Sequence, residues 1–158
     1  MTSEMGGTKP APRLRRAAPP DLSAIERLLT ASDLPLDGVR EAIGGFHVAD
    51  AGGEIVGVAG LETCCDNALL RSVAVKPDWR SHGVGRALVH HVIADAESRG
   101  IRALYLLTTT AEHYFPSFGF RQVERAEVPQ DVRETTEFAS ACPASAVVMR
   151  RDLGLVPA

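Results

Sequence analysis

The sequence predicts an α/β domain in which helices cover a mixed, mostly antiparallel sheet. Three observations carry this prediction. Residues 69–75 form an apolar β-rich segment that Pro77 ends, and an amphipathic helical pattern follows over residues 84–99. Two alternating segments, residues 46–50 and 55–61, flank a glycine turn typical of a hairpin, and residues 103–107 read as a buried strand. Strands and helices in this order favour a layered α/β fold.

The remaining elements lie between proline, glycine and polar residues. Residues 13–17 read as a first strand, which Pro19 and Pro20 end. Asp21 is placed to cap the next helix, whose inner face comprises Leu22, Ile25, Leu28 and Leu29. The further elements expected are helices at 37–43, 111–118 and 132–139 and strands at 120–123 and 146–150.

Length and composition indicate one globular domain. The chain has 158 residues, of which 45% are apolar and 23% charged, so a domain over residues 13–158 is expected after a disordered tail at 1–12. The net charge of −3 gives no signature of nucleic-acid binding. No apolar run approaches the ~18 residues of a membrane span, and no signal peptide is visible. Three cysteines are an odd number, which argues against a disulfide framework and favours a cytoplasmic location.

The turn that opens the long helix is a candidate anion site. It reads R-x-x-G-x-G from Arg80 to Gly85. The first amides of a helix lack intrahelical acceptors, and the helix dipole adds positive charge there. Gly83 and Gly85 would let a diphosphate approach the backbone. The alternative is an ordinary strand-to-helix turn with two glycines. Because Leu88 occupies the third glycine position, the turn is not a dinucleotide fingerprint.

The longer pattern V-A-V-x-P-x-x-R-x-x-G-x-G, followed by a helix, resembles the acetyl-CoA motif of the GCN5-related N-acetyltransferases, the GNAT superfamily. The segment A-x-x-x-x-x-x-F-G-F at 111–120 is similar to the next part of that pattern. The resemblance implies acetyl-CoA as cosubstrate and a sheet of about six or seven strands, flanked by about four helices. The central strands, 73–75 and 104–107, should splay apart. The implied acetyl-CoA contacts are Val73, Ala74, Val75, Arg80, Ser81, His82, Gly83, Val84, Gly85 and Arg86.

The usual acid–base residues of the superfamily are missing from this chain. Many members carry a glutamate where this sequence has Leu69, and a tyrosine where it has Phe115. We therefore expect Glu62, at the end of its strand, to act as the general base, and Tyr114 to act as the acid toward the thiolate. The alternative for Glu62 is an exposed glutamate at a strand end. An α-amine with a pKa of about 8 is already roughly 10% neutral at pH 7, so it needs only a modest base.

Arg71 and Thr109 are the expected contacts to the amine substrate. Strand alternation places Arg71 on one face with Leu69 and Val73. A guanidinium in the acceptor pocket would favour an anionic acceptor; the alternative is an arginine snorkelling to the sheet edge.

A narrower resemblance rests on the segments L-L-R-S-V-A-V, Y-L-L-T-T-T-A-E and E-F-A-S-A-C-P-A-S-A-V-V-M. They are similar to the arsenic-resistance branch of these acetyltransferases, which is related to N-acetylglutamate synthases. The branch implies a glutamate-like acceptor, or a toxic analogue of the arsinothricin or phosphinothricin kind.

Cys64, Cys65 and Cys142 invite a thiophilic interpretation, such as binding of trivalent arsenic. Adjacent cysteines are not a C-x-x-C pair, so no zinc site is expected, and small buried hydrophobes are the other interpretation. The cysteines suggest one alternative function, a metalloid-binding accessory protein. Leu69 and Phe115, at the usual acid–base positions, suggest another, a non-catalytic acyl-CoA sensor. The expected partner is a small-molecule amine, with no nucleic acid and no membrane; a homodimer is also considered.

Overall fold

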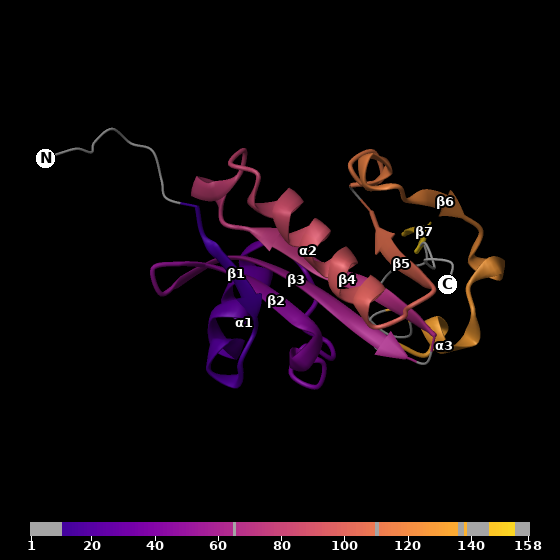
Figure 1. The fold of residues 1–158 in the computed structure, drawn as a ribbon, viewed down its shortest axis with the longest axis horizontal. Coiled ribbons are helices and arrows are strands. Elements are labelled where there is room, and N and C mark those ends of the chain that lie inside the picture. Colours follow the sequence, from indigo (N-terminus) through magenta and orange to yellow (C-terminus); the bar gives the residue numbers. More distant parts are fainter. Residues whose placement is uncertain (1–10, 65, 110, 136–137, 139–145, 154–158) are drawn as a thin grey trace, which may run out of the picture.

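The sheet has seven strands in the order β1-β2-β3-β4-β5-β7-β6 (Figure 1). The computed structural model describes residues 11–64, 66–109, 111–135, 138 and 146–153. Neighbouring strands are antiparallel except β4 and β5. The strands are β1 (Arg13–Arg16), β2 (Phe46–Ala51), β3 (Glu54–Cys64), β4 (Asn67–Val75), β5 (Ala103–Thr108), β6 (Arg121–Val123) and β7 (Val147–Asp152). The predicted α/β architecture and its mixed sheet are confirmed.

Three α-helices are described, α1 (Leu22–Ala31), α2 (Val84–Ser98) and α3 (Gln130–Arg133), and they cover both faces of the sheet. The buried residues of α2 share a core with Leu70 and Leu104. Val132 of α3 packs in a different core, with Leu69. Consecutive strand residues point to opposite faces, so α3 lies opposite α2; α1 packs on that same face, over the strands at the other end (Figure 1). No helix in the described ranges is long and apolar enough to cross a membrane.

The two central strands separate along their length. β4 and β5 pair only where residues 67–69 face residues 103–105. β4 continues to Val75 and β5 to Thr108 without further pairing to each other. The predicted splay of the central strands is therefore present, and it begins at Leu70.

A β-bulge interrupts β4 beside this gap. Gly60 faces Arg71 and Val58 faces Ala74, so Ser72 and Val73 together oppose the single residue Ala59. Ser72 has a φ of 58°, the left-handed conformation that a bulge accommodates. The extra residue shifts the alternation, so Val73 packs toward the α2 core whereas Ala74 packs in the α1 core. The prediction that Arg71 shares a face with Val73 is wrong for this reason.

Two helices predicted from the sequence are shorter or absent, and a third is described only in part. Residues 37–42 form turns instead of a helix, because Gly38 has a φ of 78°. Of residues 111–118, only Phe115–Phe118 is helical, as a 3-10 turn, since Pro116 lacks an amide proton and would clash with a preceding helical turn. Of the helix expected at 132–139, Val132 and Arg133 lie in α3 and Phe138 is helical, whereas residues 134–135 are not. Residues 136–137 and 139 lie outside the described residues. Most of the predicted tail at 1–12 also lies outside them.

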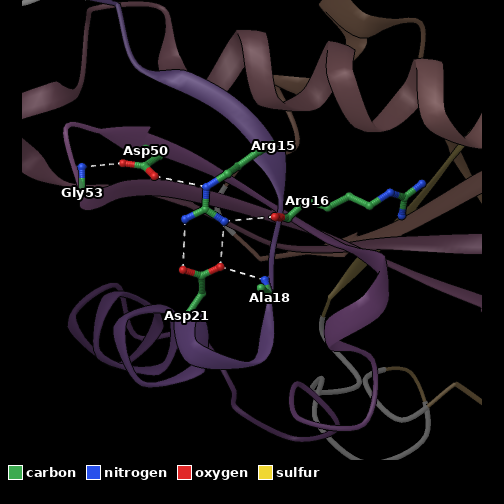
Figure 2. Close-up of polar contacts among 6 residues, drawn as sticks. All are labelled: Arg15, Arg16, Ala18, Asp21, Asp50 and Gly53. Atoms are coloured by element: carbon green, nitrogen blue, oxygen red, sulfur yellow. Dashed lines mark hydrogen bonds and ion pairs between the residues drawn. The ribbon is translucent and has the colours of Figure 1, made fainter.

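Arg15 joins the first strand to the start of α1 and to the β2–β3 turn (Figure 2). Its guanidinium donates to both carboxylate oxygens of Asp21, at 2.8 and 3.1 Å, and to Asp50 at 3.1 Å. Asp21 also accepts the Ala18 amide, and Asp50 accepts the Gly53 amide. Asp21 makes no side-chain cap to α1; the predicted cap is wrong because Arg15 and Ala18 engage its carboxylate. The network therefore holds the start of α1 against β1 and β2.

Replacing Arg15 with glutamine should lower the melting temperature by about 2–4 °C, since the side chains of the network are partly exposed to solvent. The hydrogen bond from Arg15 lowers the pKa of Asp21, and those from the Gly53 amide and Arg15 lower that of Asp50. Because their pKa is lowered in the folded state, the two carboxylates stabilise the fold fully at pH values above the ordinary pKa of 3.8. This contribution to stability is lost as the pH falls through the lowered pKa. Thermal melts should therefore show a smaller Arg15→Gln effect at pH 2.5 than at pH 7. An equal effect at both pH values would contradict this assignment.

Candidate active site

The turn before α2 forms a concave, amide-lined surface. Gly83 precedes the helix with a φ of 79°, and Ser81 has a φ of 70°. Ala87 donates to the Gly83 carbonyl at 3.0 Å, so the amides of the three residues before it lie ahead of the helical hydrogen-bond ladder. They border a cavity of about 300 Å³. This cavity is lined by Val75, Trp79, Arg80, Ser81, Gly83, Val84, Gly85, Arg86 and Tyr114. A helix start of this kind suits an anionic group.

The two glycines of the turn have different roles. A β-carbon on Gly83 would meet no atom within 4 Å, so glycine is required there by its left-handed backbone. A β-carbon on Gly85 would lie 3.4 Å from Val75 Cγ2 and 3.6 Å from the Tyr114 hydroxyl oxygen. Gly85 therefore keeps the cavity open, whereas Gly83 allows the chain to turn.

Most of the predicted acetyl-CoA contacts meet at this cavity, but three do not line it. Val73 lines the gap between β4 and β5 instead. The side chain of Ala74 packs in the α1 core. His82 lies edge-on to Trp79, with 6.0 Å between ring centroids, and lines neither this cavity nor the gap. Arg80 is anchored by its Nε, which donates to the Val75 carbonyl at 3.1 Å.

A second cavity, of about 210 Å³, lies in the gap between β4 and β5. It is lined by Leu34, Leu70, Arg71, Ser72, Val73, Leu106, Leu107, Thr108, Ala111, Tyr114 and Phe115. Tyr114 lines this gap cavity and the amide-lined cavity, so the two meet at its ring. Arg71 is the one charged residue among the described residues that line the gap cavity.

Tyr114 carries the hydroxyl at this junction. Its ring packs edge-on against Phe115 and Phe118, each with 5.2 Å between centroids, and 40% of the residue is exposed. Burial raises the pKa of Tyr114 above its ordinary value of 10, although Arg86 opposes the shift. The hydroxyl therefore stays protonated near neutral pH. Phe115, at the usual acid position, is buried beside Phe120.

Arg71 is fully enclosed, with no exposed side-chain surface. Its Nη1 donates to Glu62 at 3.1 Å, its Nε to the Ser72 hydroxyl oxygen at 3.0 Å, and its Nη2 to the Pro35 carbonyl at 3.5 Å. The alternative of an arginine snorkelling to the sheet edge is therefore wrong. Pro35 and Leu34 come from the segment between α1 and β2, which thus covers the acceptor side of the gap.

Glu62 lies beside the gap and does not line it. Its side chain is 14% exposed and forms an ion pair with Arg71, so the alternative of an exposed strand-end glutamate is also wrong. Glu62 borders a separate hollow of about 360 Å³, together with Glu41, Thr63 and Arg99. The sequence singled out Glu62 and Arg71 separately, but the fold makes them one unit.

Thr109 is exposed and lines neither cavity. Its neighbour Thr108 lines the gap cavity instead, and the Thr108 hydroxyl oxygen accepts the Ala111 amide at 2.9 Å. Sequence reasoning missed Thr108 and Ser72, although the run of small polar residues after the buried strand was a signal for Thr108.

The three cysteines of the thiophilic interpretation cannot be placed relative to one another. Cys65, Cys142 and the side chain of Cys64 lie outside the described residues. Within those residues, no group of three or more histidine, cysteine, aspartate or glutamate side chains could hold a metal ion.

The sequence of this chain is similar to that of acetyltransferases. A model of the acetyltransferase (GNAT) domain matches residues 42–122. The amino-acid acetyltransferase of Mycobacterium tuberculosis is 31% identical over 131 residues, which cover 77% of this chain and 75% of that relative. The amino-acid acetyltransferase of Pasteurella multocida is 32% identical over 91 residues; these cover 56% of this chain but only 21% of that longer protein.

Solved structures share the fold. N-acetylglutamate synthase from Neisseria gonorrhoeae, complexed with coenzyme A and N-acetyl-glutamate, superposes with a TM-score of 0.79 at 24% identity. The match covers 94% of this chain and 36% of that one. A Mycobacterium tuberculosis protein in complex with CoA gives a TM-score of 0.76 at 26% identity, and the match covers 90% and 99% of the two chains. The chain therefore belongs to the GNAT acetyltransferase family, which confirms the enzyme class and the acetyl-CoA cosubstrate predicted from the motif.

Proposed function

We propose that this chain transfers an acetyl group to the amine of a small amino acid with an anionic side chain. Glutamate is the simplest such acceptor, and analogues with an arsenic or phosphorus acid group fit the same chemistry. The supporting observation is that Arg71 is the one charged residue among the described residues that line the gap. A guanidinium favours a planar or tetrahedral oxyanion through paired hydrogen bonds. Similarity to amino-acid acetyltransferases supports the same class of acceptor.

The residues of the amide-lined cavity would hold the pyrophosphate of acetyl-CoA. They fit a diphosphate, because the residues at the start of α2 border an opening that a larger side chain at Gly85 would obstruct. Acetyl-CoA supplies an acetyl group activated as a thioester. The backbone of residues 73–75 has no partner in β5 and would pair with the pantetheine.

Tyr114 would supply the proton that the leaving thiolate takes up. Replacing Tyr114 with phenylalanine should lower kcat by less than the ~100-fold associated with a full general acid, because a thiolate is a fairly stable leaving group. Since the pKa of Tyr114 is raised, the loss should be constant from pH 6 to 9. Steady-state rates across that range test this; a loss confined to alkaline pH would contradict it.

Glu62 would accept the proton of the amine once the acceptor has engaged Arg71, because that ion pair otherwise occupies its carboxylate. The Glu62→Gln change should lower kcat/KM more than Tyr114→Phe does, and most at low pH, where the amine is largely protonated. Glu41→Gln is a matched control, because Glu41 borders the same hollow as Glu62 but is not among the described ion-pair partners of Arg71. A Glu62→Gln enzyme with full kcat/KM from pH 6 to 9 would exclude Glu62 as the base.

The proposed reaction is tested by measuring CoA release with glutamate, aspartate, phosphinothricin and neutral amino acids as acceptors. We expect turnover with the dianionic acceptors and little with the neutral ones. A role in arsenic resistance, in the cytoplasm, is the narrower form of the proposal. It requires that an arsenic-containing amino acid be acetylated at a kcat/KM at least equal to that of glutamate.

A second candidate function is a non-catalytic sensor of acyl-CoA. It is favoured by the position of Leu69, which is fully buried in the α3 core where other members carry an acid. The same screen separates the two functions. Steady CoA release with any amine excludes the sensor, whereas tight acetyl-CoA binding without release favours it.

A further inference from the structure

Ser72 occupies an unusual position on the wall of the gap. It is buried, with 5% of its surface exposed, and it lines the gap cavity next to Arg71. Its φ of 58° is uncommon for a residue with a β-carbon. The bulge therefore turns a serine, rather than a glycine, into the left-handed conformation, although glycine would adopt it without strain. The hydroxyl group is what serine adds over glycine at this position, so its hydrogen bonds show what the residue can contribute.

The hydrogen bonds of Ser72 leave its donor unused. A serine hydroxyl can donate one hydrogen bond and accept two. The Ser72 oxygen accepts the Arg71 Nε–H at 3.0 Å, and none of the described residues accepts the Ser72 proton. Because Nε occupies one side of the oxygen, the O–H bond must point away from the guanidinium. A buried donor of this kind costs free energy unless a partner reaches it.

We propose that Ser72 donates a hydrogen bond to the anionic group of the acceptor, beside Arg71. This inference rests on the proposed function. A carboxylate has two oxygens with several lone pairs, so one oxygen can face the guanidinium while the other faces the Ser72 hydroxyl. Arg71 supplies the charge, and Ser72 supplies a neutral donor of fixed direction. An acceptor without a paired oxygen group would leave that buried donor unpaired, so Ser72 is a specificity-determining residue.

The test compares Ser72→Gly with Ser72→Ala. Both changes remove the hydroxyl, but only glycine adopts the left-handed backbone without strain. We expect Ser72→Gly to raise the glutamate KM about tenfold, with kcat within about twofold of wild type and unchanged acetyl-CoA affinity. Ser72→Ala should raise KM at least as much, and it should melt below Ser72→Gly because alanine keeps the left-handed strain. If Ser72→Gly keeps the wild-type KM, the hydroxyl does not contact the acceptor and the inference is overturned.

A second comparison separates direct contact from an effect through Arg71. In an Arg71→Lys background the Nε–H donor is absent, so a residue that only positions Arg71 should have no further effect. Direct donation predicts that Ser72→Gly still raises the glutamate KM in that background, by about threefold or more. No further rise would overturn the inference. A wild-type enzyme that acetylates glutamate but tolerates Ser72→Gly removes this inference alone, whereas one that acetylates no anionic amine removes the proposed function with it.

Discussion

Replacing Gly85 with valine should weaken acetyl-CoA binding by an order of magnitude or more in a protein that still folds. The β-carbon alone would lie 3.4 Å from Val75 Cγ2 and 3.6 Å from the Tyr114 hydroxyl oxygen. Two further methyl groups would extend into the space that the amides border. Gly85 lies in the first turn of α2, where valine has a helix propensity no worse than that of glycine, so folding should be preserved.

Isothermal titration calorimetry with acetyl-CoA measures this loss of affinity. Two further variants, at Gly85 and Gly83, separate the effect of side-chain size from that of backbone conformation. Gly85→Ala adds only the β-carbon, which fits at van der Waals distance, so it should weaken binding much less. Gly83→Ala meets no neighbour but forces a left-handed alanine, which should cost about 1 kcal/mol of stability. Its main effect should be a lower melting temperature. Unchanged acetyl-CoA affinity in a folded Gly85→Val protein would show that the diphosphate binds elsewhere.

Replacing Arg71 with alanine should raise the acceptor KM roughly ten- to hundredfold, because a hydrogen bond to a charged group contributes about 1.5–3 kcal/mol. The same change should lower stability. It removes the ion pair with Glu62 and two further hydrogen bonds of a side chain with no exposed surface. Removing one member of a buried pair costs about 3 kcal/mol, and the partial exposure of Glu62 places this case at the low end. Acetyl-CoA affinity should be nearly unchanged.

The double variant Arg71→Ala with Glu62→Gln separates the two effects. Neutralising Glu62 removes the carboxylate charge that has lost its ion pair with Arg71, so part of the lost stability should return while the acceptor KM stays high. Arg71→Lys should restore only part of the affinity, since an ammonium cannot make the paired contact. Thermal melts and acceptor titrations on the same preparations give both readouts. If neutral amines are better acceptors than anionic ones for the wild-type enzyme, Arg71 is structural and the proposed acceptor class is wrong.

The sequence by itself determined the sheet, the long helix and the amide-lined turn. These follow from local rules: alternation in β2 and β3, an apolar face along α2, and proline and glycine at the turns. The amphipathic pattern predicted over residues 84–99 is confirmed, because one side of α2 is buried at Leu88, Val89, Val92, Ile93 and Ala96. The predictions failed where another residue or contact opposed the local pattern. Gly38 broke a short helix, Pro116 shortened another, and Arg15 took the Asp21 carboxylate from its cap.

Only the tertiary structure decided how the site is assembled. The bulge at Ser72 depends on pairing with β3, whereas the run from Leu69 to Val75 reads as an uninterrupted strand. The contact between Arg71 and Glu62 joins neighbouring strands, and the Tyr114 hydroxyl approaches Gly85 from a distant part of the chain. The different roles of Gly83 and Gly85 also depend on what surrounds each glycine. Periodicity and spacing describe one segment at a time, and such contacts between segments arise only when the core packs.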